Sequence, residues 1–158
     1  MMTDFPWQEP NWIAQTQLIL DSFARLLGRE LIDRYGTGLE QSQRLFEADF
    51  VVVSHNTADD PILNYGNQAA LNLWETDLES LLSMPSRKTA EPVHRDERAE
   101  LLRRVTEDGF IDDYQGIRIS ATGKRFRIDQ AIVWNLIDND GQKVGQAATF
   151  SDWEMLAE

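Results

Sequence analysis

Three runs of strand-forming residues near the C-terminus, joined by two tight turns, constrain the fold most. They are "FIDDYQGIRISA", "KRFRIDQAIVWNLID" and "KVGQAATFSDW". The linking segments contain "TG" and "NDG", which are strong turn signals between strands. Strands that follow one another this closely pair antiparallel. The last third of the chain therefore predicts a three-stranded antiparallel meander.

The middle run also predicts which of its side chains are buried. Apolar residues alternate along it with one glutamine in register, and a strand places alternate side chains on the same face. The set that shares this face is Phe126, Ile128, Gln130, Ile132, Trp134 and Leu136. We expect that face to be buried, with the amide of Gln130 among apolar neighbours.

Two more strands and a set of helices precede the meander. "DFVVVSH" and "ILNY" predict a strand pair within residues 50–65, joined by the turn formers "NTADDP". The stretch "NYGNQAALNLWE" then enters a helix for which Asn67 is a suitable N-cap. Further helices are predicted at about residues 78–84 and before Gly109, where a C-terminal glycine cap belongs.

The N-terminal segment predicts a helix over about residues 11–33, with Asn11 as its N-cap. Glycines in "YGTG" follow, and we divide the chain there into a helical extension, residues 1–38, and a body, residues 39–158. An apolar stripe on the helix must be buried against its own body or a second copy, and we expect a homodimer. The candidate contacts are Trp12, Ile19, Leu20, Phe23 and Leu27.

Composition excludes several kinds of function. The 158 residues include no cysteine, which removes disulfides, zinc–thiolate sites and cysteine-linked cofactors. The net charge of −12 disfavours nucleic acid as a partner. No apolar run approaches the ~20 residues of a membrane span, and the first residues lack a secretion signal. We expect a cytoplasmic protein with neither a membrane nor a nucleic-acid partner.

The order of two strands, several helices and a three-stranded meander resembles that of PAS sensor domains. Tyr65, Asn67, Ala69 and Ala70 match the extended turn that enters the first PAS helix. Residues 45–153 resemble more closely the PAS-related MEKHLA family, through "VVVSHNTADDPILNYGNQAALNLWE" and the segment from "GFIDDYQG" to "GQAATF". Such domains stand alone in bacteria, notably cyanobacteria, and end plant homeodomain-leucine zipper factors. This chain resembles the stand-alone type.

The resemblance implies an α+β fold, a PAS-like five-stranded antiparallel sheet with helices on one face, plus the N-terminal helical extension. It also implies a sensory or regulatory module with a small-molecule cleft between sheet and helices, read out by an unknown protein partner. Two alternatives stay open. One is a ligand-free interaction or dimerisation domain, with Trp134, Phe126 and Phe150 filling the cleft. The other is a small enzyme that uses the cleft.

Five residues are candidates to line such a cleft and bind a ligand: Asn67, Arg118, Gln130, Trp134 and Gln146. Inward amides on these strands bind the polar edge of the ligand in flavin-binding relatives, and an indole beside them could stack on an aromatic ring. The simpler interpretation is that Gln130 and Gln146 bond to each other, to backbone or to a trapped water. For Asn67, helix capping is a sufficient role.

No catalytic or metal site is evident in the sequence. His94 lies on the helix that can supply the axial ligand in haem-binding PAS domains, but its charged neighbours predict exposure, so we do not expect haem. His55 and His94 lack the neighbours that a metal site needs. No serine, threonine or lysine stands in a nucleophile motif. The identity of any cofactor is left open, and an enzyme is the less favoured interpretation.

Overall fold

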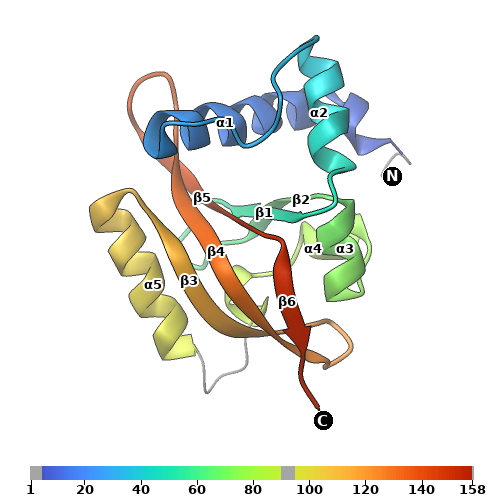
Figure 1. The fold of residues 1–158 in the computed structure, drawn as a ribbon, viewed down its shortest axis with the longest axis vertical. Coiled ribbons are helices and arrows are strands. Elements are labelled where there is room, and N and C mark those ends of the chain that lie inside the picture. The colour runs from blue at the N-terminus through green and yellow to red at the C-terminus, as the bar shows by residue number, and fades with distance from the viewer. Residues whose placement is uncertain (1–4, 90–94, 158) are drawn as a thin grey trace.

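A computed structural model describes residues 5–89 and 95–157, which form one antiparallel sheet with helices on both faces (Figure 1). The strand order β2-β1-β5-β4-β3 is that of an α+β PAS fold. The strands are β1 Val51–His55, β2 Leu63–Gly66, β3 Phe110–Ile119, β4 Arg125–Ile137, β5 Lys143–Phe150 and β6 Asp152–Met155. The helices are α1 Pro10–Leu27, α2 Gly38–Phe46, α3 Gln68–Trp74, α4 Leu78–Leu81 and α5 Arg95–Asp108, with 3-10 turns η1 Pro6–Gln8 and η2 Ser86–Thr89.

The predicted meander is confirmed, with one addition. β3 pairs with β4 and β4 with β5, while β5 also pairs with β1 and brings the first hairpin into the sheet. The third predicted run divides at Ser151 into two strands, because β5 pairs with the end of β4 and β6 pairs with its beginning. The sheet thus contains the five predicted strands and a short sixth strand, β6.

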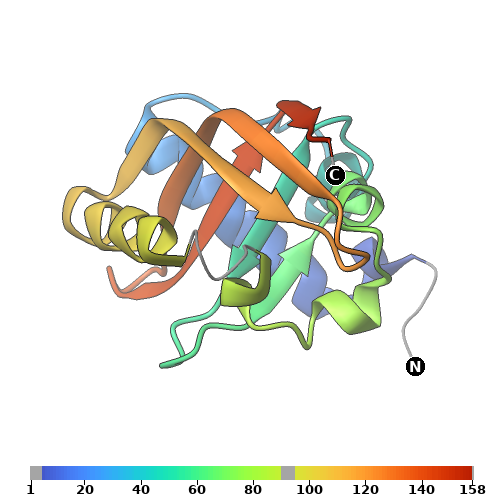
Figure 2. The same ribbon diagram turned by 90° about the horizontal axis from the view of Figure 1, so that it is seen from below.

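The helices form two layers. Figure 2 shows α1 behind the sheet, with η2 and α5 in front of it. The alternation of β1 matches this arrangement, since Val52 belongs to the core beneath α1 and Val51 to the core beneath α3. The N-terminal helix α1, with α2 packed against it, therefore occupies the face opposite η2 and α5.

α1 is shorter than predicted and its stripe packs within the same chain. The helix starts at Pro10 rather than at an Asn11 cap, and ends where Gly28 adopts the left-handed conformation at φ +74. Of the proposed dimer contacts, Trp12, Ile19, Leu20 and Phe23 are buried by the sheet and α2, and Leu27 is half-buried against them. The four buried side chains thus pack within their own chain and not against a second copy, whereas the homodimer itself stays a prediction.

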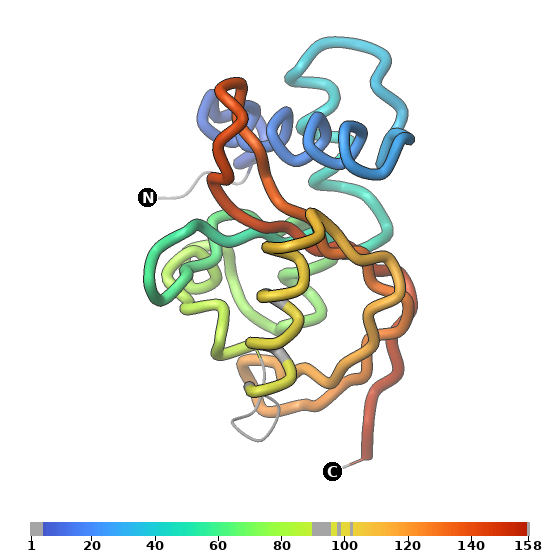
Figure 3. The backbone as a smooth tube through the Cα atoms, turned by 90° about the vertical axis from the view of Figure 1, so that its left-hand side faces the viewer, coloured from blue at the N-terminus to red at the C-terminus, as the bar shows by residue number. Residues whose placement is uncertain are grey.

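In space the N-terminal helix packs against the body as a layer on its sheet. Its apolar side chains share one core with Trp134 and Leu136 of β4, and the β4–β5 turn rises alongside the helix (Figure 3). A hydrogen bond from the backbone N–H of Ile137 to Ser22 Oγ, 2.9 Å long, fixes that turn to α1.

β4 contains a bulge that exchanges its two faces. Tyr114 pairs with Ala131 and Gly116 with Ile128, so one residue of β3 lies opposite two of β4. The extra residue is Gln130, whose φ of +53 is left-handed. Every side chain after it points to the face opposite to the one that simple alternation predicts. Phe126 and Ile128 therefore share a face with Ala131 and Val133, and not with Trp134.

Candidate functional site

A cavity lies between the sheet and the second helical layer, where a PAS cleft is expected. The cavity has a volume of about 80 Å³. Its walls come from every long strand together with α3, η2 and α5, and are mostly apolar. The polar side chains in this wall are Ser54, His55, Ser86, Thr89, Tyr114, Arg118 and Gln146.

Arg118 of β3 is a buried cation in the cavity wall. Its residue is only 7% exposed. Nη2 donates to the hydroxyl of Tyr114 at 2.8 Å, and Nη1 donates to the carbonyl of Ile117 at 2.9 Å. These bonds use two of the five N–H groups of a guanidinium. Within residues 5–89 and 95–157, no carboxylate pairs with this side chain.

Tyr114 reaches Arg118 because a glycine lies beneath its ring. A Cβ atom built on Gly116 would come within 2.2 Å of the tyrosine hydroxyl and 2.6 Å of Cζ. The ring can therefore cross the strand only where residue 116 has no side chain. In that position the ring centre is 5.2 Å from the guanidinium carbon, within cation–π range.

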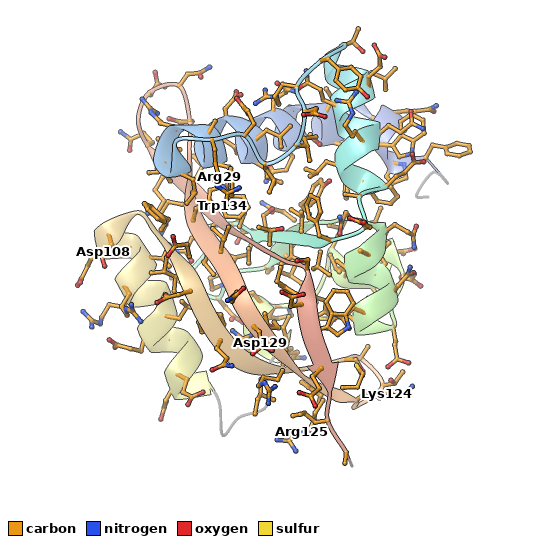
Figure 4. The ribbon with its side chains drawn as sticks, viewed as in Figure 1. Arg29, Asp108, Lys124, Arg125, Asp129 and Trp134 are labelled. Atoms are coloured by element: carbon orange, nitrogen blue, oxygen red, sulfur yellow. The ribbon has the colours of Figure 1, made fainter. Side chains whose placement is uncertain are left out.

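Four other arginines of this acidic chain, Arg34, Arg87, Arg103 and Arg127, have carboxylate partners. Arg127 lies on the outer face of β4 and pairs with Asp129 at 3.3 Å and with Glu154 at 2.6 Å. Arg34 likewise pairs with Asp21 and Glu30. Asp129 lies on the part of β4 away from α1 (Figure 4). The carboxylates of Asp129 and Glu154 thus pair with Arg127 and not with Arg118.

Gln146 of β5 provides a second unsatisfied group. It is 2% exposed, and its Nε2 donates to Asn135 Oδ1 at 3.1 Å. Asn135 in turn donates from Nδ2 to the carbonyl of Val105 at 3.0 Å, which fixes the direction of the chain of bonds. Gln146 Oε1 is buried and accepts no hydrogen bond from the described residues. An acceptor in this state costs about 1–3 kcal/mol unless an occupant donates to it.

Two predicted cleft residues lie elsewhere because of the bulge. Gln130 is exposed, so the prediction that its amide is buried beside Gln146 is wrong. Trp134 is fully buried, but beneath α1 (Figure 4). Its ring meets Phe23 edge-on at 5.0 Å and its Nε1 donates to the carbonyl of Ile19 at 3.3 Å. It is not among the residues that line the cavity.

Asn67 is a structural residue, as capping requires. Its Oδ1 accepts from the backbone N–H groups of Ala70 and Val52, both at 3.1 Å. Its Nδ2 donates to the carbonyls of Leu45 and Phe50. Two donors and two accepted bonds fill the capacity of a primary amide, so nothing is left for a ligand. Asn67 does not line the cavity.

Glu75, the residue after α3, links this helix to the β3–β4 turn at one edge of the cavity. Its carboxylate accepts from Thr122 Oγ1 at 2.6 Å and Ser120 Oγ at 3.0 Å, and lies 3.4 Å from Lys124 Nζ. These hydrogen bonds and the lysine lower the pKa of Glu75 below its usual value. The bonds tie the end of α3 to the β3–β4 turn, next to the cavity residue Trp74.

Of the two histidines, only His55 falls within the described residues. His55 lies in the cavity wall and its Nδ1 donates to the carbonyl of Asn56 at 2.8 Å, which fixes the ring. His94 falls outside the described residues. In the ranges 5–89 and 95–157, no three histidine, aspartate, glutamate or cysteine side chains gather as metal ligands. No helix in those ranges is long and apolar enough to cross a membrane.

Of the five candidates, the structure brings Arg118 and Gln146 to the cavity and places the others elsewhere. Sequence reasoning missed Tyr114, which orients the arginine. The signal was present in "YQGIR", where a tyrosine stands two residues before a glycine and four before the arginine.

Comparison with known proteins shows the family to which the sequence of this chain is similar. The MEKHLA domain model matches residues 13–155. The chain is 24% identical over 153 residues to the homeobox-leucine zipper protein REVOLUTA of Arabidopsis thaliana, covering 93% of this chain and 18% of that protein. The chain thus spans less than a fifth of the length of the curated relatives that it matches.

Solved structures show the same fold. A PAS domain from Colwellia psychrerythraea is 13% identical, with a TM-score of 0.62 over 74% of this chain and 94% of that one. A light-oxygen-voltage domain is 20% identical, with a TM-score of 0.56 over 75% of this chain and 86% of that one.

Proposed function

Since this chain belongs to the MEKHLA domain family and has a PAS-type fold, we propose that it is a sensory module that binds a small molecule in the sheet–helix cavity. The observation that carries the proposal is the cavity itself. Phe126 and Phe150 pack against Trp74, and about 80 Å³ remains open beside them. A ligand-free interaction domain needs no such space.

The size of the cavity favours a small ligand. Pockets for drug-sized molecules measure about 300–1,000 Å³, and a 150 Å³ cavity holds benzene. A cavity of about 80 Å³ favours a ligand smaller than a flavin or haem, and the chain has no cysteine for a covalent cofactor bond. The proposed ligand is therefore a small metabolite and not a large cofactor.

Signalling would follow from a shift in conformational populations. A ligand that binds one arrangement of η2 and α5 against the sheet more tightly than another changes the ratio of the two. A protein partner would read that change. The homodimer, the stand-alone bacterial type and a cytoplasmic location stay predictions of the same kind. A small enzyme is not favoured, because no carboxylate lies among the described residues of the wall.

The test is ligand retention by the whole chain. Purified protein is incubated with the small-molecule fraction of a cell extract, desalted and examined by native mass spectrometry beside the variant Ala148→Met. Ala148 lies in the cavity wall, so the longer side chain occupies the space. We expect wild type to hold a species that is lost on denaturation and that the variant does not hold. Equal retention by both, or retention by neither, would reject the proposal in favour of the ligand-free domain.

A further inference from the structure

The most unusual group in the molecule is the cation of Arg118. Removing a charge from water costs several kcal/mol unless an opposite charge or hydrogen bonds compensate. The neutral hydroxyl of Tyr114 and the carbonyl of Ile117 supply part of that compensation. Since the chain carries 27 acidic residues, the lack of a described carboxylate here is not caused by a shortage of acids.

We propose that the cavity selects a small carboxylate, with Arg118 as its counter-ion and the hydroxyl of Tyr114 as an added donor. This inference rests on the proposed function and specifies the chemical class of its ligand. A planar guanidinium can bind a carboxylate through two parallel N–H groups, and three of its five remain without an acceptor among the described residues. The tyrosine hydroxyl accepts from the arginine and still has its own proton to donate.

The rest of the wall suits the body of such an acid. Beyond the guanidinium the cavity is lined by Ile128, Ala131, Val133 and Ala148, which offer apolar contact and no competing charge. A short-chain aliphatic acid places its alkyl group against these residues. The free acceptor Gln146 Oε1 adds a site that a donor on the ligand or a bridging water can satisfy.

The test compares butyrate with butyramide, which has nearly the same shape and no charge. Each is titrated into ¹⁵N-labelled protein at constant ionic strength and followed by amide chemical shifts. The variants are Arg118→Gln and, as a matched control, Arg127→Gln, whose arginine is on the outer face with its own carboxylates. A second variant, Arg118→Lys, keeps the charge and loses the paired N–H groups.

We expect butyrate to shift the amides of Ala131, Val133 and Ala148 and to bind wild type more tightly than butyramide. Charge-assisted hydrogen bonds predict that Arg118→Gln weakens butyrate binding by about tenfold or more. Arg127→Gln should leave butyrate affinity unchanged. Arg118→Lys should bind butyrate with an affinity between those of wild type and Arg118→Gln. Equal binding of both probes to wild type, or equal butyrate affinity in Arg118→Gln, would overturn the carboxylate assignment.

The two levels of the proposal fail in different ways. Binding of butyramide at the same residues with the same or higher affinity leaves a ligand cavity and rejects only the anion. If neither probe shifts a cavity residue and no extract species is retained, the ligand cavity itself is rejected. Preserved dispersion of the amide shifts in each variant shows that it is folded.

Discussion

The two faces of the sheet are built from the same strands but are filled differently. Beneath α1, Trp134 lies against Phe23, and Trp12 stacks on Tyr65 with ring centres 4.6 Å apart. Beneath η2 and α5, small residues such as Ala131 and Ala148 leave a cavity. The guanidinium of Arg118 lies in its wall and pairs with no carboxylate among the described residues. One face is therefore filled by packed side chains, while the other leaves space for an occupant beside Arg118 and Gln146.

The largest expected effect is a difference in the free energy of unfolding between variants at two neighbouring residues of β4. Trp134→Ala removes an indole from the filled face and should lower the free energy of unfolding by about 3–5 kcal/mol. Val133→Ala, on the cavity face, should cost only about 1–2 kcal/mol because it removes two methyl groups beside existing space. Urea denaturation of both variants measures this. Equal losses would mean that the two faces are packed alike.

A second pair of variants compares the two faces of the sheet by enlarging two neighbouring alanines of β5. Ala147 lies opposite Trp134, and Ala148 lies opposite Val133. Ala147→Met should overpack the filled face and destabilise the protein by about 1–3 kcal/mol. Ala148→Met should enter the cavity and change stability by less than about 1 kcal/mol, as measured by the same denaturation. The reverse order would contradict the assignment of the faces.

The bulge that separates the faces can be tested at Gln130. A non-glycine residue with left-handed backbone costs about 1 kcal/mol that glycine does not. Gln130→Gly should therefore stabilise the protein by up to about 1 kcal/mol, whereas Gln130→Val should destabilise it. Thermal unfolding of the two variants decides the matter. A stabilising valine would show that β4 continues without a bulge and that Trp134 faces the cavity.

The smallest expected effect concerns Glu75, whose hydrogen bonds link the end of α3 to the β3–β4 turn. Its pKa is lowered in the folded state by hydrogen bonds from Thr122 and Ser120, so the contribution to stability is present above the usual glutamate pKa, 4.5. It is lost as the pH falls through the lower, folded pKa. Glu75→Gln should reduce the melting temperature at neutral pH, and the gap to wild type should close in acid. A gap that is independent of pH would exclude the ionised carboxylate as the cause.

Local patterns in the sequence predicted the strands and their order, because alternation and turn chemistry act over a few residues. Asn67 was predicted as a cap for the same reason. The bulge at Gln130 was not predicted, since its left-handed backbone follows from the register in which β3 pairs with β4, which the alternation within a single strand does not reveal. That one residue moved Trp134 out of the predicted site. The contact of α1 with its own sheet was also beyond local pattern, because an apolar stripe does not identify the surface that covers it.

The most direct test of the difference between the faces is xenon binding, followed by the methyl signals of the protein in solution. Xenon enters apolar cavities without needing a particular hydrogen-bonding partner. Rising xenon pressure should shift the methyl groups of Leu101, Ala131 and Val133, which line the cavity, and leave those of Leu20 and Leu136 beneath α1 unchanged. Shifts beneath α1, or none at the cavity residues, would contradict the account of one filled face and one face open to a ligand.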